Sequence, residues 1–175
     1  SYIYSSELGL SRSRNIGLNS CLTKYAHILD DDVQVYDINN LISLTSDFDK
    51  YDAQVLINRV ITDEGTLFKN YPKDYYKYSL ISCASVSSIE MAVDIDFLRL
   101  HAINFDENFG LGTSLPSGEE FIFLTDCLNK GAEIKHREKI IFSHEYLTSG
   151  KDFFSTTNKL NAKKYMFKRV FRSHY

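Results

Sequence analysis

The amino-acid sequence predicts an α/β fold, because strand patterns alternate with helix patterns along its 175 residues. Three observations carry this prediction. Residues 25–29 (YAHIL) form a nearly unbroken apolar run that stops at three aspartates. Residues 53–61 alternate apolar and polar side chains as a strand does. Residues 119–130 place apolar side chains at helical spacing and end at Gly131, a typical helix stop.

The other elements follow in order along the chain. We expect a short strand at 2–5, a helix at about 14–24 capped by Ser11 or Ser13, and a strand at 25–29 buried on both faces of a parallel sheet. A helix at 38–46, the strand at 53–61, a hairpin turn at 63–66 and a loop at 71–78 come next. Segment 92–103 mixes strand and helix patterns. A returning strand or pair of strands is expected at 134–142, and a basic amphipathic helix is expected at 161–172.

The charge is close to balanced overall and uneven along the chain. Lys and Arg number 20 against 23 Asp and Glu, a net charge of −3, which excludes binding of nucleic acid driven by the charge of the whole molecule. Residues 151–175 carry seven Lys or Arg and one Asp, so this tail is basic and the remaining body is acidic. We therefore expect no nucleic-acid partner. Contact of the tail with an anionic membrane surface is one expectation, and a solvated helix face, or one docked on other protein, is the alternative.

The cysteines and the hydropathy pattern favour a cytoplasmic protein. Three widely spaced cysteines without a CxxC pair predict neither a disulfide framework nor a structural zinc site. No apolar stretch approaches the roughly 18 residues that cross a bilayer, and the first residues lack the pattern of a signal peptide.

Three adjacent carboxylates give the strongest chemical signal. Asp30, Asp31 and Asp32 directly follow an expected strand, where they repel one another unless a cation or a polar network neutralises them. Mg²⁺ or Mn²⁺ suits such oxygen ligands and leaves coordination positions for substrate phosphates. A solvated acidic turn is the alternative.

A second segment favours binding of an anion. Residues 9–17 (GLSRSRNIG) place Arg12 and Arg14 beside backbone N–H groups at an expected helix N-terminus, and guanidinium groups bind phosphate in a bidentate manner. A capped helix with surface arginines is the alternative.

Taken together, four segments resemble family 2 glycosyltransferases of the GT-A fold. They are 9–17 (GLSRSRNIG), 26–33 (AHILDDDV), 105–110 (FDENFG) and 118–121 (GEEF) with the later Gly131, in the order and spacing of that family. The resemblance covers about residues 2–145. It implies a GT-A, Rossmann-type mixed sheet with flanking helices that lacks its N-terminal strands, so that 1–150 form a partial catalytic domain and 151–175 a basic helical tail. Such a sheet exposes an edge, and we expect self-association across it.

The resemblance also implies an activity and a set of roles. The activity is inverting transfer of a sugar from a nucleotide-diphosphate donor to a saccharide or lipid-linked acceptor in polysaccharide or glycoconjugate biosynthesis. Asp32 is the implied metal ligand, and Asp30 and His144 are further candidate ligands. Asp30 or Asp31 is expected to lie nearer the nucleotide ribose. Arg14 and Asn15 match a pair near the donor. The protein is then cytoplasmic, or peripheral at the inner face of a membrane.

An inverting displacement needs a base, and a carboxylate at a helix start suits this role. The motif position points to Glu120, where the family usually has Asp, and Glu119 is the neighbouring candidate. First-turn acids that stabilise a helix dipole are the alternative explanation of this pair. Two other functions compete with glycosyl transfer: a metal-dependent nucleotidyl or phosphoryl transferase, and a non-catalytic sugar-binding remnant of a transferase.

Overall fold

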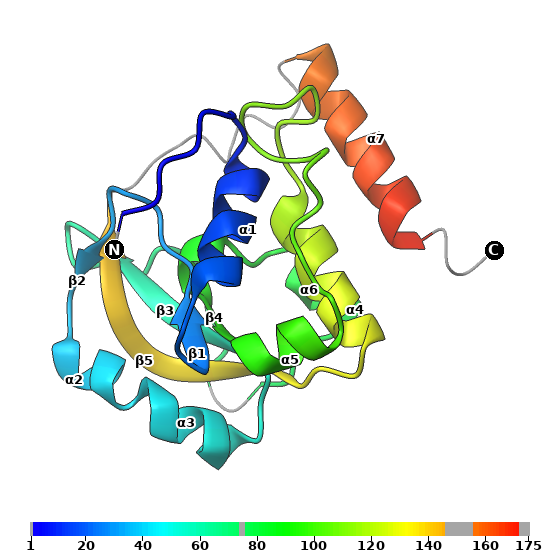
Figure 1. Ribbon diagram of the computed structural model, residues 1–175. Coiled ribbons are helices and arrows are strands. Elements are labelled where there is room, and N and C mark those ends of the chain that lie inside the picture. The colour runs from blue at the N-terminus through cyan, green and yellow to red at the C-terminus, as the bar shows by residue number, and fades with distance from the viewer. Residues whose placement is uncertain (1, 74–75, 146–155, 172–175) are drawn as a thin grey trace.

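The computed structural model describes residues 2–73, 76–145 and 156–171, which form a mixed sheet covered by helices on both faces (Figure 1). The elements in chain order are α1 (Leu10–Ser20), β1 (Tyr25–His27), β2 (Gln34–Val35), α2 (Ile38–Ile42), α3 (Leu44–Tyr51), β3 (Val55–Thr62), α4 (Leu80–Cys83), the 3₁₀ helix η1 (Ser88–Glu90), β4 (Met91–Asp94), α5 (Ile95–Leu100), α6 (Glu119–Asn129), β5 (Ile134–His144) and α7 (Thr157–Phe171).

The sheet has the strand order β1-β4-β3-β5-β2. Its two longest strands, β3 and β5, are parallel neighbours, and the other pairings, β1 with β4, β4 with β3 and β2 with β5, are antiparallel. The parallel pair begins with Val55 opposite Ile134 and ends with Thr62 opposite His144. This pairing brings the end of β5 beside the turn that follows β3.

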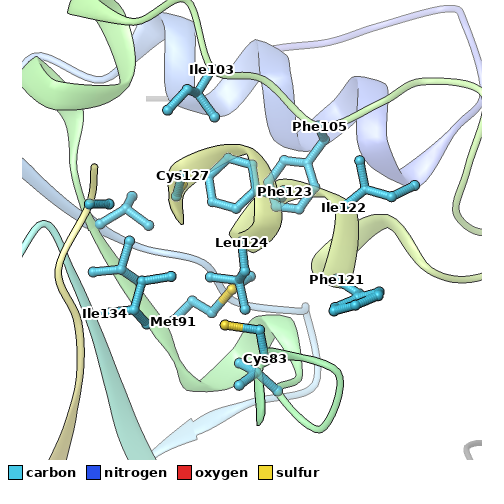
Figure 2. Packing of buried hydrophobic residues seen from close by; sticks show 14 of the residues in the cluster. Cys83, Met91, Ile103, Phe105, Phe121, Ile122, Phe123, Leu124, Cys127 and Ile134 are labelled. Atoms are coloured by element: carbon cyan, nitrogen blue, oxygen red, sulfur yellow. The ribbon is translucent and has the colours of Figure 1, made fainter. Parts of the chain in front are cut away.

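The apolar side chains of β3 supply both layers of the core. Val55 and Ile57 face the larger cluster, under α4 and α6, whereas Leu56 faces a smaller cluster under α3. Figure 2 shows the larger cluster, where Phe105 and Phe123 stack with ring centroids 4.3 Å apart. Burial on both faces suits this strand to the centre of the sheet. A shift of one residue would still leave apolar side chains inside, so the pairing with β4 and β5 sets its register.

Several elements after β3 agree with the sequence patterns. Helix α6 spans Glu119–Asn129 and is followed by Gly131 in a left-handed conformation (φ 87°). The turn at 63–66 closes with a hydrogen bond from Thr62 N to Thr66 O. Segment 92–103 contains both elements that its pattern mixes: β4 ends at Asp94, whose side chain then caps α5 by accepting from Phe97 N. Helix α7 occupies the expected basic segment and begins four residues earlier than predicted, at Thr157.

Three N-terminal predictions are wrong. Residues 2–5 form no strand, since no described strand pairs with them, and Tyr2 and Tyr4 are exposed. The first helix begins at Leu10 rather than near Arg14, because Leu10 N donates to Leu111 O, a contact made by a distant loop. The strand at 25–29 is not buried within a parallel stack: β1 covers three residues, is half-buried, and lies antiparallel to β4 at the sheet edge.

The helix expected at 38–46 is divided at Ser43 into α2 and α3. The buried Arg137 of β5 explains the division. Its Nη2 donates to Asn40 O at 2.6 Å and to Ser43 Oγ at 2.8 Å, so this carbonyl bonds to a guanidinium group at the point where the helix breaks. Within the described residues, none of the helices has the length and apolar character that crossing a bilayer requires.

Candidate active site

Arg14 brings together four segments that are far apart in the sequence. Its guanidinium is buried in the second turn of α1. Nη2 donates to Asp30 Oδ1 at 3.2 Å and to Ser88 Oγ at 2.7 Å, while Nη1 donates to Glu119 Oε1 at 3.3 Å and to Glu120 Oε1 at 3.4 Å. The predicted acidic segment after β1 and the predicted acid pair of α6 therefore meet at one side chain. We call Arg14, Asp30, Ser88, Glu119 and Glu120 the Arg14 cluster.

The start of α6 is positioned by two glycines. Gly118 precedes the acid pair with φ 102°, a left-handed conformation that favours glycine. Gly110 passes close to the cluster, where an added Cβ would lie 3.0 Å from Ser11 Oγ and 3.3 Å from Glu119 Cδ. Ser11 Oγ in turn donates to Phe109 O at 2.6 Å. These contacts hold the acid pair, α1 and the 105–110 loop at close range.

The two glutamates differ in burial. The side chain of Glu119 is 5% exposed and that of Glu120 is 22% exposed. Burial, with the charge of Glu120 added, raises the pKa of Glu119 to about 7, although Arg14 opposes this change. Glu119 Oε2 is buried without a hydrogen-bond partner among the described residues. Three carboxylates thus surround one guanidinium, and the excess negative charge suits a proton or a cation.

Asn15 lies next to Arg14 and anchors the 105–110 loop. Phe105 N donates to Asn15 Oδ1 at 2.8 Å, and Asn15 Nδ2 donates to Phe105 O at 2.9 Å and to Glu107 Oε1 at 3.1 Å. The Arg14 guanidinium lies over the Phe105 ring, 5.4 Å from its centroid. The structure therefore gives Asn15 a positioning role, and direct contact with a donor stays a prediction.

Asp32 and His144 form a second polar pair, where the acidic turn meets the end of β5. Asp32 Oδ1 lies 3.1 Å from His144 Nε2, and His144 Nδ1 lies 2.5 Å from Glu145 O. A proton on Nδ1 therefore bonds to that carbonyl, which leaves Nε2 to share either a proton or a cation with the carboxylate. Adjacent ligands about 2.1 Å from an octahedral Mg²⁺ lie about 3.0 Å apart, close to the observed separation. The pair fits two ligands of such an ion.

The other predicted metal and nucleotide residues take different positions. Asp30 is hydrogen-bonded to Arg14, and Asp31 is exposed in the turn after β1. Among the described residues no three His, Cys, Asp or Glu side chains gather as a metal site. A hollow of about 440 Å³, lined by residues that include His101, Asp106 and Arg169, contains none of the predicted site residues in its wall.

The helix start that carries the expected anion site is placed differently from the prediction, and anion binding by this segment stays a prediction. The first N–H of α1, on Leu10, already bonds to Leu111 O, and Arg14 lies one turn further along, with its guanidinium bonded to carboxylates. A long-range contact explains the different helix start. A Cβ added to Gly112 would lie 3.3 Å from Gly9 Cα, so the distant loop packs directly against the start of α1.

Ser88 is the member of the Arg14 cluster that sequence reasoning did not identify. A local signal was present, because Ser87 and Glu90 have the spacing of a capping box, which the structure contains: Ser87 N donates to Glu90 Oε2 at 2.7 Å. This box sets η1, and η1 presents Ser88 to Arg14. The pattern predicts the short helix, but nothing in it indicates the partner.

The comparisons with known proteins concern structure rather than sequence. No protein-family model matches the chain, and no curated protein sequence matches it. Solved structures of TarS from S. aureus do resemble it. The structure of TarS residues 1–349 has a TM-score of 0.68 at 15% identity, the same segment with UDP has 0.67 at 16%, and that with UDP-GlcNAc has 0.69 at 14%.

The likeness extends over 95% of this chain in each case and over 46% to 48% of the three TarS segments, so the chain spans about half the length of these neighbours. At such low identity the comparison concerns architecture alone. The mixed sheet with helices on both faces has the GT-A, nucleotide-diphospho-sugar transferase-like fold that the four sequence segments predict.

Proposed function

We propose that this chain transfers a sugar from a nucleotide-diphosphate donor to an acceptor hydroxyl, with inversion at the anomeric carbon, in polysaccharide or glycoconjugate biosynthesis. One observation carries the proposal: Arg14 joins Asp30, after β1, to the acid pair at the start of α6, on a GT-A fold. The TarS complexes contain UDP and UDP-GlcNAc, which supports a donor of this class. Membership of family 2 and a cytoplasmic, membrane-peripheral location are part of the same proposal.

Within the pair, Glu120 is the proposed general base and Glu119 its buried partner. The base must reach the acceptor hydroxyl, and the Glu120 side chain is the more exposed of the two. Arg14 contacts both carboxylates and fixes their orientation. Because the pKa of Glu119 is raised to about 7, this residue carries a proton over part of the neutral range, which limits the repulsion that Glu120 meets when it is ionised.

Asp32 and His144 are the proposed protein ligands for Mg²⁺ or Mn²⁺. When bound, such an ion supplies Lewis-acid neutralisation of the departing diphosphate. Asp32 and His144 would hold that ion at the end of β5, and Glu120 accepts the proton of the acceptor. Asp30 and Asp31 remain candidates for contact with the nucleotide.

The identity of the released products distinguishes this proposal from its competitors. The chain is incubated with UDP-GlcNAc and a panel of saccharide and lipid-linked acceptors in Mg²⁺ or Mn²⁺. Glycosyl transfer releases UDP together with an inverted glycoside, which NMR of the anomeric proton identifies. Release of GlcNAc 1-phosphate, with UMP transferred to the acceptor, would instead assign a nucleotidyl transferase, and donor binding without turnover would assign a sugar-binding remnant.

Substitutions at the two polar groups test the assigned roles. Glu120→Gln is expected to lower kcat by at least about 10²-fold with donor affinity retained, because only proton transfer is lost. Asp32→Asn is expected to weaken the cation-dependent part of UDP binding, measured by calorimetry with Mn²⁺ and with EDTA. Asp96→Asn, at an exposed carboxylate of α5, is the matched control. Unchanged turnover in Glu120→Gln would remove Glu120 from the mechanism.

A further inference from the structure

Helix α7 is fastened to the body of the protein along one face. Ala162 and Val170 are buried, and Val170 belongs to the larger core cluster. Met166 packs against that cluster and against Gly118, where an added Cβ would lie 2.7 Å from Met166 Sδ. Arg169 Nη2 donates to Asp126 Oδ2 of α6 at 2.8 Å. The helix is therefore held in one orientation beside α6 (Figure 1).

The opposite face of α7 carries apolar side chains in contact with water. Leu160, Phe167 and Phe171 are 55%, 49% and 36% exposed. At roughly 100° of rotation per residue, these three side chains point to one side of the helix, opposite Ala162. The rings of Phe167 and Phe171 lie with their centroids 6.0 Å apart. They form a stripe that the fold leaves in water although its burial would be favourable.

Lysines border this stripe. Lys164 and Lys168 are exposed and follow the apolar side chains around the helix, and α7 contains no Asp or Glu. A positive border beside exposed phenylalanines is the pattern of a helix that lies in the interface of an anionic bilayer. A soluble polyanion would account for the lysines but not for the apolar stripe.

We propose that the outer face of α7, defined by Leu160, Lys164, Phe167, Lys168 and Phe171, docks on the surface of an anionic lipid bilayer. Its phenylalanines enter the headgroup region and its lysines pair with lipid phosphates. The attachment of α7 to α6 then holds the Arg14 cluster at a fixed orientation to the membrane. Docking through α7 gives the proposed membrane-peripheral location a specific surface, and it does not require that sugar transfer takes place; the corollary, that the acceptor is lipid-linked, rests on the proposed function.

Flotation of the full chain with vesicles tests the proposal. Binding is expected to vesicles of 70% phosphatidylcholine and 30% phosphatidylglycerol and to be lost with phosphatidylcholine alone. Phe167→Ser is expected to lower the partition coefficient at least about tenfold. The pair Lys164→Gln with Lys168→Gln is expected to lower it about 25-fold, about fivefold for each charge. Matched controls are Leu22→Ser and the pair Lys24→Gln with Lys50→Gln, exposed sites outside α7 that are expected to leave binding unchanged.

Circular dichroism and UDP binding, measured on the same samples, separate this proposal from the proposed function. Variants that retain their fold and UDP affinity but lose vesicle binding support membrane docking. Absence of vesicle binding in the parent, or equal losses in the α7 variants and the controls, would overturn it. A dimer in solution that Phe167→Ser dissociates would assign the stripe to a second copy of the chain instead.

Discussion

Arg14 is the residue on which the arrangement of the site depends. Its side chain is 7% exposed and meets three carboxylates and a hydroxyl. Burial of one guanidinium among several acids is stable only when their charges are mutually compensated. Asp30 is 37% exposed and keeps part of its hydration, whereas Glu119 lies at 5% and has little access to water. The excess negative charge therefore destabilises the ionised form of Glu119 and raises its pKa.

The raised pKa of Glu119 predicts a measurable pH dependence of stability. Burial and the charge of Glu120 lift it from 4.5 to about 7, so the folded state binds a proton more tightly than the unfolded state. The resulting stabilisation is fully present below about pH 4.5 and is lost as the pH rises through about 7. Denaturant unfolding of the parent should show this fall between pH 5 and pH 8, and Glu119→Gln should lack that part of it.

Glu64→Gln provides the control for this experiment, because it removes an exposed carboxylate in the turn after β3. It should reproduce the pH dependence of the parent. An equally steep fall in Glu119→Gln and in the parent would show that another group is responsible.

At the scale of elements, the contact of α7 with the start of α6 links the C-terminal helix to the acid pair. Gly118→Ala places a Cβ 2.7 Å from Met166 Sδ and also forces a side chain into a left-handed conformation, which costs roughly 1–2 kcal/mol. The variant should lose at least this much unfolding free energy and also turn over more slowly, since Glu119 and Glu120 follow directly.

A double-mutant cycle separates the steric effect from the backbone effect. Met166→Ala in the Gly118→Ala background should recover part of the loss, with a coupling energy of at least about 0.5 kcal/mol, whereas the backbone cost remains. Strictly additive losses in unfolding free energy would show that α7 does not press on Gly118.

At the scale of the whole molecule, the open edge of the sheet predicts self-association. β1 lies at one end of the strand order, and Ile28 N and Lys24 O bond toward β4. By alternation, the N–H groups of Tyr25 and His27 point toward the open edge, where a strand of a second copy can pair. Light scattering should show an increase of mass with protein concentration.

Proline at the edge tests which surface is involved. Tyr25→Pro removes an outward N–H group and should shift the equilibrium to monomer, whereas Tyr25→Ala keeps that group, removes only the ring that stacks on Phe48, and should still associate. A parent chain that stays monomeric at all concentrations would contradict the prediction.

The site was predictable in its residue types but not in its contacts. The acidic triplet, Arg14 and the acid pair of α6 stand out because their chemistry and order follow a recognisable pattern. Ser88 does not, since a serine in a short capping box has no signal for a partner 74 positions away. The start of the first helix differs from its prediction for the same reason. The hydrogen bond from Leu10 N to Leu111 O joins distant segments, and no local pattern indicates it.

Local patterns are enough to predict β3, α6 and α7, where apolar periodicity is strong, because burial of those side chains decides the conformation of each segment locally. Long-range packing makes β1 a half-buried edge strand, lets Arg137 divide the helix after Asp37, and joins Asp30 to Glu119 through Arg14. Those outcomes depend on contacts between residues some 16 to 105 positions apart, which no local pattern contains.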